Sequence, residues 1–131
     1  MNKPFILANI DEAIRLVTEQ PEELLPLGTY RAKLECGTLY CTAGLCATSA
    51  HFCALGWTWR RNIVAITPKG GVRPANDLDC IDTNNLVEDH FGPRAFNNVF
   101  APRCEPWSLG TDKEIALRRL HNQRTLVESS P

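Results

Sequence analysis

The chain has 131 residues, a hydrophobic fraction of 44% and a formal net charge of −1. A chain of this length forms one domain, which we place at residues 1–131. A net charge so close to zero argues against general nucleic-acid binding, although it leaves a local basic patch open. The opening segment lacks a signal-peptide pattern, so we expect a cytoplasmic protein whose six cysteines are reduced.

The first predicted helix starts near Asn9, because Asn9 and Glu12 have the spacing of a capping box. The apolar residues that follow recur at helical spacing and form one face: Ile10, Ala13, Ile14 and Val17. Pro21 ends this helix, and residues 22–34 form a connector whose leucines lie against the core.

A second helix is predicted from Leu39 to Leu55, in a stretch without a single charged side chain. Thr38 is its expected N-cap, and Gly56 stands where a left-handed residue commonly follows a helix. A helix that is apolar nearly all round has to be buried, so we expect it to be the centre of the core. The stretch is too short and too rich in Thr, Ser and Gly to span a bilayer, which takes about 20 apolar residues, and we expect no membrane partner.

Residues 57–62 and 63–67 are rich in aromatic and β-branched side chains, which predicts two short strands or a small hairpin. Residues 68–71 form a turn, and residues 72–79 are a loop or a third short strand. A two-stranded ribbon is not stable alone, so it must pack on the helices.

Two further helices are predicted toward the C-terminus. One begins near Asp82 or Thr83 and ends at Gly92, and residues 94–100 add a turn or two after it. The last helix opens with a capping box at Thr111 and runs to about Gln123, and residues 128–131 fray. The fold class is therefore α+β: a compact, mostly helical single domain with a buried central helix and a small β-hairpin or ribbon.

One resemblance emerges from this order of elements. It consists of Pro21-Glu22, the run Cys36-Gly-Thr-Leu-Tyr-Cys-Thr-Ala-Gly44, residues 96–102 and the helix from Thr111 to Leu120. The chain resembles a group of small uncharacterised proteins encoded by bacteriophages and prophages, with a Cys-Gly-Thr-x-x-Cys-x-Ala-Gly core. Relatives carry Trp after the Ala-Gly pair, where this chain has Leu45. The resemblance implies a phage or prophage accessory protein and transfers no active site.

Charge is unevenly distributed along the chain. Residues 36–76 carry basic side chains and no acid, whereas residues 77–91 carry acids and neither Lys nor Arg. The two runs could neutralise each other, or the basic strip could meet an anionic ligand or partner. Trp57 and Trp59 share one face of a strand, where they either cover the core or form an aromatic shelf for a base. The candidate partner- or ligand-binding residues are Trp57, Trp59, Arg60, Arg61, Lys69 and Arg73.

The cysteines lack the paired knuckle spacing of structural zinc sites. Buried core thiols are therefore the first interpretation, and we expect neither a metal site nor a cofactor. Zinc is the alternative, and its ligands would then be Cys36, Cys41, His51 and Cys53. Cys36 and Cys41 bracket the predicted helix start, so a thiol acidified by the helix dipole is a third interpretation. We find no pattern that identifies catalytic residues.

Three functions remain open at this point. The first is a phage-type accessory protein that binds a host or viral macromolecule, most readily a protein, stoichiometrically and without catalysis. The second is a nucleotide or nucleic-acid binder that uses the Trp/Arg ribbon. The third is a small zinc- or thiol-dependent enzyme. The partner and the oligomeric state are left open.

Overall fold

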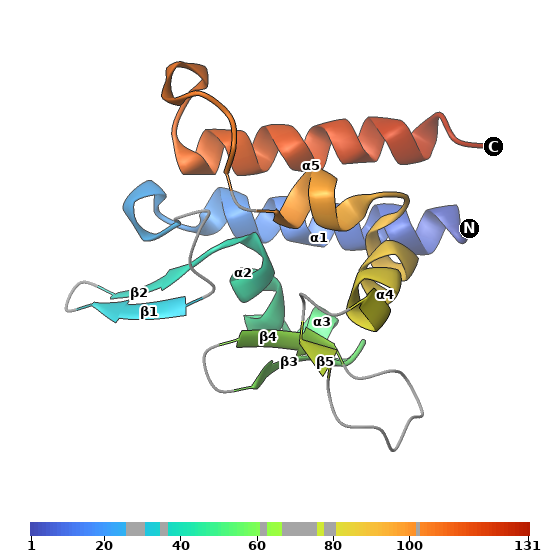
Figure 1. Cartoon of the computed structure of the whole chain (residues 1–131), viewed down its shortest axis with the longest axis horizontal. Coiled ribbons are helices and arrows are strands. Elements are labelled where there is room, and N and C mark those ends of the chain that lie inside the picture. Colours follow the sequence, from blue (N-terminus) through green and yellow to red (C-terminus); the bar gives the residue numbers. More distant parts are fainter. Residues whose placement is uncertain (26–30, 35–36, 61–62, 67–75, 78–80, 102) are drawn as a thin grey trace.

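The computed structural model of the chain describes residues 1–25, 31–34, 37–60, 63–66, 76–77, 81–101 and 103–131. It describes the backbone only for residues 31–34, 37–40, 59–60, 63, 65, 76–77 and 81–85. The described part is a mostly helical domain, as the sequence predicts. Its two longest helices, α1 (Lys3–Glu19) and α5 (Asp112–Glu128), lie side by side and antiparallel, so the two termini meet at one end (Figure 1).

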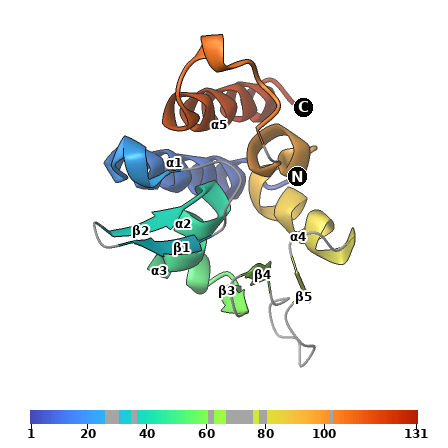
Figure 2. The same cartoon turned by 60° about the vertical axis from the view of Figure 1, so that its left-hand side comes forward.

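Helix α1 takes the middle position in the fold. It packs against α5 on one side and against α2 and α4 on the other, and the strands lie on the side away from α5 (Figures 1 and 2). The prediction that it starts near Asn9 is wrong. Asn2 is the N-cap, its side chain accepts the N–H of Phe5, and Pro4 occupies the first turn, where a missing N–H costs nothing.

Helix α5 opens with the predicted capping box. The Thr111 side chain accepts the N–H of Glu114, and the Glu114 carboxylate accepts the N–H of Thr111. The helix continues beyond the predicted end at Gln123, because Val127 is buried and extends its apolar face. Lysines tie its two ends to α1: Lys113 Nζ donates to Thr18 O and Gln20 O, and Lys3 Nζ donates to Glu128 O.

The predicted single helix from Leu39 to Leu55 is wrong. The chain forms strand β2 (Gly37–Tyr40), helix α2 (Thr42–Thr48) and a short helix α3 (Ala50–Cys53). Ser49 breaks the run with an extended backbone, and Thr48 Oγ1 donates to Leu45 O at 2.6 Å. Hydroxyl side chains compete in this way for helical carbonyls. Residues 41–47 are all buried, so the stretch does belong to the core.

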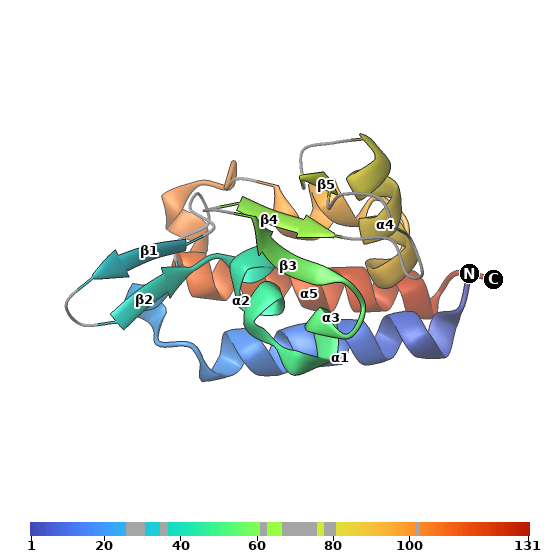
Figure 3. The same ribbon diagram turned by 90° about the horizontal axis from the view of Figure 1, so that it is seen from below.

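Gly56 has a φ of 101° after α3, the left-handed conformation that the sequence predicts there. The strands form two antiparallel groups. Strand β1 (Arg31–Leu34) pairs with β2, and β3 (Trp57–Arg60), β4 (Ile63–Ile66) and β5 (Asn76–Asp77) lie in the order β3-β4-β5. In Figure 3, β3 and β4 lie next to α2, with which both are in contact, whereas β1 and β2 extend away from α2 to the left.

Helix α4 (Ile81–Phe91) is followed by a π-helical turn, η2 (Phe96–Phe100), and a 3-10 turn, η3 (Trp107–Leu109). Another 3-10 turn, η1 (Glu22–Leu24), follows α1. The aromatic part of the core joins α3, β3, α4 and η2 through four side chains: Phe52, Trp57, Phe91 and Phe100. No helix within the described ranges combines the length and hydropathy needed to cross a bilayer.

Candidate binding site

The structure removes Trp57 from the predicted aromatic shelf. Its side chain is 1% exposed and packs against Phe52 and Phe91, so its ring is a core element and not a stacking surface. Trp59 and Arg60 also lie on β3, but only the backbone of these two residues is described. The other predicted binding residues, Arg61, Lys69 and Arg73, lie outside the described residues.

Trp57 takes part in a buried polar network. Its Nε1–H donates to His90 Nδ1 at 3.0 Å, so the neutral His90 ring carries its proton on Nε2. Burial lowers the pKa of His90, which favours this neutral form. Asn9, also fully buried, donates to His90 O and accepts a hydrogen bond of 2.6 Å from His51 Nε2. The network joins α1, α3, β3 and α4, and we assign it a structural role.

The three predicted zinc ligands that the structure describes do not form a metal site. Cys41 is buried at the start of α2, whereas His51 and Cys53 are exposed, and Cys36 lies outside the described residues. Among the side chains that the structure describes, no three of His, Cys, Asp and Glu are placed to hold a metal ion.

The expectation of mostly buried thiols holds for two of the four described cysteines. Cys41 and Cys46 are buried and free, and burial raises the pKa of both thiols, which makes them poor nucleophiles. Cys53 and Cys104 are exposed free thiols. The interpretation of Cys41 as a thiol acidified by a helix start is therefore wrong, because desolvation outweighs the nearby N–H groups of Gly44 and Ala43.

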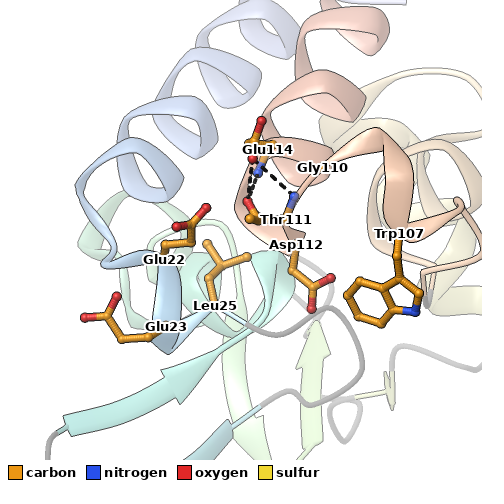
Figure 4. A pocket seen from close by; sticks show the side chains of 8 residues that line it. All are labelled: Glu22, Glu23, Leu25, Trp107, Gly110, Thr111, Asp112 and Glu114. Atoms are coloured by element: carbon orange, nitrogen blue, oxygen red, sulfur yellow. Dashed lines mark hydrogen bonds between the residues drawn. The ribbon is translucent and has the colours of Figure 1, made fainter.

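The candidate site is a groove of about 460 Å³ between η1 and the segment that leads from η3 into α5 (Figure 4). Its volume falls within the range of about 300–1,000 Å³ that is typical of ligand pockets. The groove is open to solvent along one side. It is lined by Glu22, Glu23, Leu25, Trp107, Gly110, Thr111, Asp112 and Glu114, which we call the acidic groove.

Local sequence builds both walls of the acidic groove. On one wall, Pro21 ends α1, and Leu25, 1% exposed, anchors η1 to the core while Glu22 and Glu23 stay in solvent. On the other wall, Gly110 has a φ of 129°, a conformation that side chains rarely tolerate, and it lets the chain turn from η3 into α5. The buried Leu25 therefore lies at the floor of the groove, and the exposed carboxylates of Glu22 and Glu23 lie at its edge.

Trp107 is the most exposed large hydrophobic side chain in the described part of the chain, at 78%. Arg103 holds it in place, because its guanidinium lies 4.3 Å from the ring centroid. Arg103 in turn donates to Asp112 at 2.9 Å and to the carbonyls of Glu105 and Pro106. One face of the indole is thus supported while the rest of the ring faces solvent at the mouth of the groove (Figure 4).

The carboxylates that line the groove differ in the ion pairs and hydrogen bonds that they form within the protein. Asp112 pairs with Arg103, and Glu114 belongs to the capping box of α5. Glu22 and Glu23 are exposed, and no described residue forms an ion pair with either. None of the described residues that line the groove is basic, so the carboxylates of Glu22 and Glu23 give this part of the structure a negative potential.

A second cavity of about 370 Å³ lies between η2 and α5, beside Arg119 and Glu105. Arg119 binds both oxygens of the Glu105 carboxylate at 2.8 Å and 2.7 Å and donates to Ala101 O at 2.6 Å. These bonds hold the pKa of Glu105 at about 2. We call this the Arg119 cluster. Its bonds run within the protein, closing the π-helical turn onto α5.

Sequence reasoning missed the acidic groove. It gave neither Trp107 nor Glu22 and Glu23 a binding role. A signal was present, since Trp107 is a large aromatic residue in a Pro-flanked loop without periodic apolar partners. Such a residue has no helix or strand face on which to be buried.

Comparison with family models, with curated proteins and with solved structures gave no match for this chain.

Proposed function

We propose that this protein is a phage-type accessory protein that binds a host or viral macromolecule, most readily a protein, stoichiometrically in the cytoplasm and modulates it without catalysis. The observation that carries this proposal is Trp107, an exposed indole at the mouth of a groove whose ring is in contact with the Arg103 guanidinium. Tryptophan is among the residues that dominate binding energy at protein interfaces. A pre-positioned indole also binds without the entropic cost of ordering it.

The chemistry of the groove favours binding over turnover. The described residues that line it supply carboxylates and an indole, and none of them supplies a thiol, imidazole or amine that could act as a nucleophile. A groove open along one side also suits a segment of a macromolecule better than an enclosed small substrate. The phage origin rests on the sequence resemblance alone.

The test is a quantitative capture experiment with Trp107→Ala. The tagged protein is incubated with host lysate, the captured protein is identified and purified, and native mass spectrometry gives the stoichiometry of the complex. We expect a complex of fixed stoichiometry that Trp107→Ala weakens at least ten-fold, since a hot-spot residue contributes about 2 kcal/mol or more.

Leu109→Ala is the matched control, because Leu109 is also an exposed apolar residue of η3 but does not line the groove. It should bind as the wild type does. Capture that is equal in all three proteins, or a captured protein that is chemically altered in a catalytic manner, contradicts the proposal.

A further inference from the structure

We infer that the acidic groove takes a basic segment of the partner protein, with a Lys or Arg side chain of that segment lying between the indole of Trp107 and the carboxylates of Glu22 and Glu23. This inference rests on the proposed function and specifies the chemistry of the partner. It commits to a peptide segment rather than to a nucleic acid or a second copy of this chain. Three observations support it in turn.

The first observation is the charge of the groove. Glu22 and Glu23 form one edge and are the carboxylates that no described residue pairs with. Among the described residues, two cations close to the groove, Arg103 and Lys113, are already bonded to other groups. Arg103 holds Asp112 and two backbone carbonyls, and Lys113 Nζ donates to Thr18 O and Gln20 O, at the C-terminal end of α1. An incoming cation therefore finds free carboxylates, whereas a phosphate backbone is repelled.

The second observation is the state of the indole. Arg103 shows that one face of Trp107 accepts a guanidinium at 4.3 Å from the ring centroid. With 78% of the side chain exposed, the opposite face is open to a second cation. Trp is the aromatic residue that binds cations best. The structure thus contains an internal example of the contact that we propose for the partner.

The third observation is the apolar floor. Leu25 is 1% exposed at the base of the groove, and Trp107 stands across from it (Figure 4). Lys and Arg side chains bury their aliphatic stems along apolar surfaces and keep the charged head in a polar environment. A groove with an apolar floor and a carboxylate edge matches both parts of such a side chain. An acidic or purely apolar segment would match only one part or neither.

The test uses a short synthetic peptide of Gly, Ser, Lys and Arg, together with a control peptide in which Glu replaces every Lys and Arg. Binding to the full chain is followed by isothermal titration calorimetry, and the site is located by NMR from the Trp107 indole and the amides of Gly110 and Thr111. We expect the basic peptide to shift these signals and the acidic peptide to leave them unchanged. Affinity should fall as salt concentration rises.

The variant that decides the question is Glu22→Gln with Glu23→Gln. Removing two exposed ion-pair partners should weaken peptide binding roughly three- to ten-fold and flatten its salt dependence. The matched control is Asp89→Asn with Glu128→Gln, which removes the same charge from exposed positions outside the groove. This control should bind the peptide as the wild type does, which separates a site from general electrostatic attraction.

Several outcomes would overturn the inference. One is equal weakening by both double variants, which would show general attraction only. Another is a salt-insensitive complex with the captured partner that depends on Trp107 but not on Glu22 and Glu23, and in that case the proposed function stands while the basic segment does not. A dimer that the groove variant dissolves would place a second copy there, and an oligonucleotide that shifts the same signals would replace the peptide. Loss of Trp107-dependent capture altogether would contradict the proposed function itself.

Discussion

Glu105 and Glu22 are two glutamates that border different cavities, and they differ in the groups that bind their carboxylates. Glu105 binds both arms of the Arg119 guanidinium, and Arg119 is also bonded to the carbonyl of Ala101. Glu22 is exposed on the side of the acidic groove opposite Trp107 (Figure 4) and has no ion-pair partner among the described residues. Glu105 therefore stabilises the fold, whereas Glu22 is exposed and can bind an outside partner.

The comparison teaches how to separate a structural polar site from a binding site. A network whose donors and acceptors are matched internally has little left to offer a ligand, and breaking it costs stability. A groove whose carboxylates and indole face solvent contributes little to stability. Substituting these side chains should therefore weaken partner binding without lowering the unfolding free energy. Each prediction below tests one side of this distinction, in order of expected effect.

The largest effect is expected from Arg119→Met. Removing the guanidinium leaves the Glu105 carboxylate and the carbonyls of Val99 and Ala101 without their donor, in a part of the protein where Arg119 is 7% exposed. Breaking such a pair costs about 3 kcal/mol of unfolding free energy. Urea denaturation followed by circular dichroism measures it. Arg118→Met, which removes an exposed arginine one position away, should cost far less, and equal losses would remove the distinction.

Gln123→Leu should have the next largest effect. The Gln123 side chain is 1% exposed, donates to the carbonyls of Phe91 and Pro93, and accepts a hydrogen bond from Asn98. Leucine keeps the volume but leaves these groups unsatisfied, at a cost of about 1–3 kcal/mol. The same denaturation experiment reports it. Asn122→Leu, at the neighbouring exposed position, serves as the control, and a neutral Gln123→Leu would contradict the structural role of the amide.

The fall of the unfolding free energy at acidic pH should depend on Glu105. Its pKa is about 2 in the folded protein, lowered from 4.5 chiefly by the hydrogen bonds from Arg119. A lowered carboxyl pKa stabilises the fold above the unfolded-state value, and this stabilisation is lost as the pH falls from about 4.5 toward 2. The unfolding free energy of the wild type should therefore fall more steeply in this window than that of Glu105→Gln. Asp89→Asn should keep the wild-type slope, since Glu105 is intact in it. If the unfolding free energies of the wild type and Glu105→Gln fell in parallel with pH, the Glu105–Arg119 ion pair would be contradicted.

The smallest effect on stability is expected in the acidic groove. Trp107→Ala and the double change of Glu22 and Glu23 to Gln should each alter the unfolding free energy by no more than about 0.5 kcal/mol, because all three side chains are exposed. Thermal melts of the purified variants measure this directly. A large loss of stability in either variant would show that the groove side chains stabilise the fold, which would contradict a role in partner binding alone.

Local sequence signals predicted several elements well. The capping box at Thr111 and Glu114, the left-handed Gly56 and the end of α4 before Gly92 follow from side-chain chemistry that acts within one turn. The predicted helix over residues 39–55 failed because its uncharged composition indicates burial and not conformation. Hydroxyl side chains and the extended Ser49 divide that stretch into β2, α2 and α3. The start of α1 was missed because Asn9 resembles a cap, whereas its amide instead bonds His90 and His51 in the core.

The sequence by itself determined the helical character of the domain, the capping of α5 and the burial of residues 41–47, because these depend on neighbouring side chains and on hydrophobicity. Only the tertiary structure decided which polar side chains bond to other groups of the protein and which face solvent. Arg119 and Glu105 are 14 residues apart and find each other through the return of the chain from η2 to α5. Glu22 and Trp107 meet across a groove because α1 and α5 are antiparallel. Contacts over such separations depend on packing geometry, which no local pattern encodes.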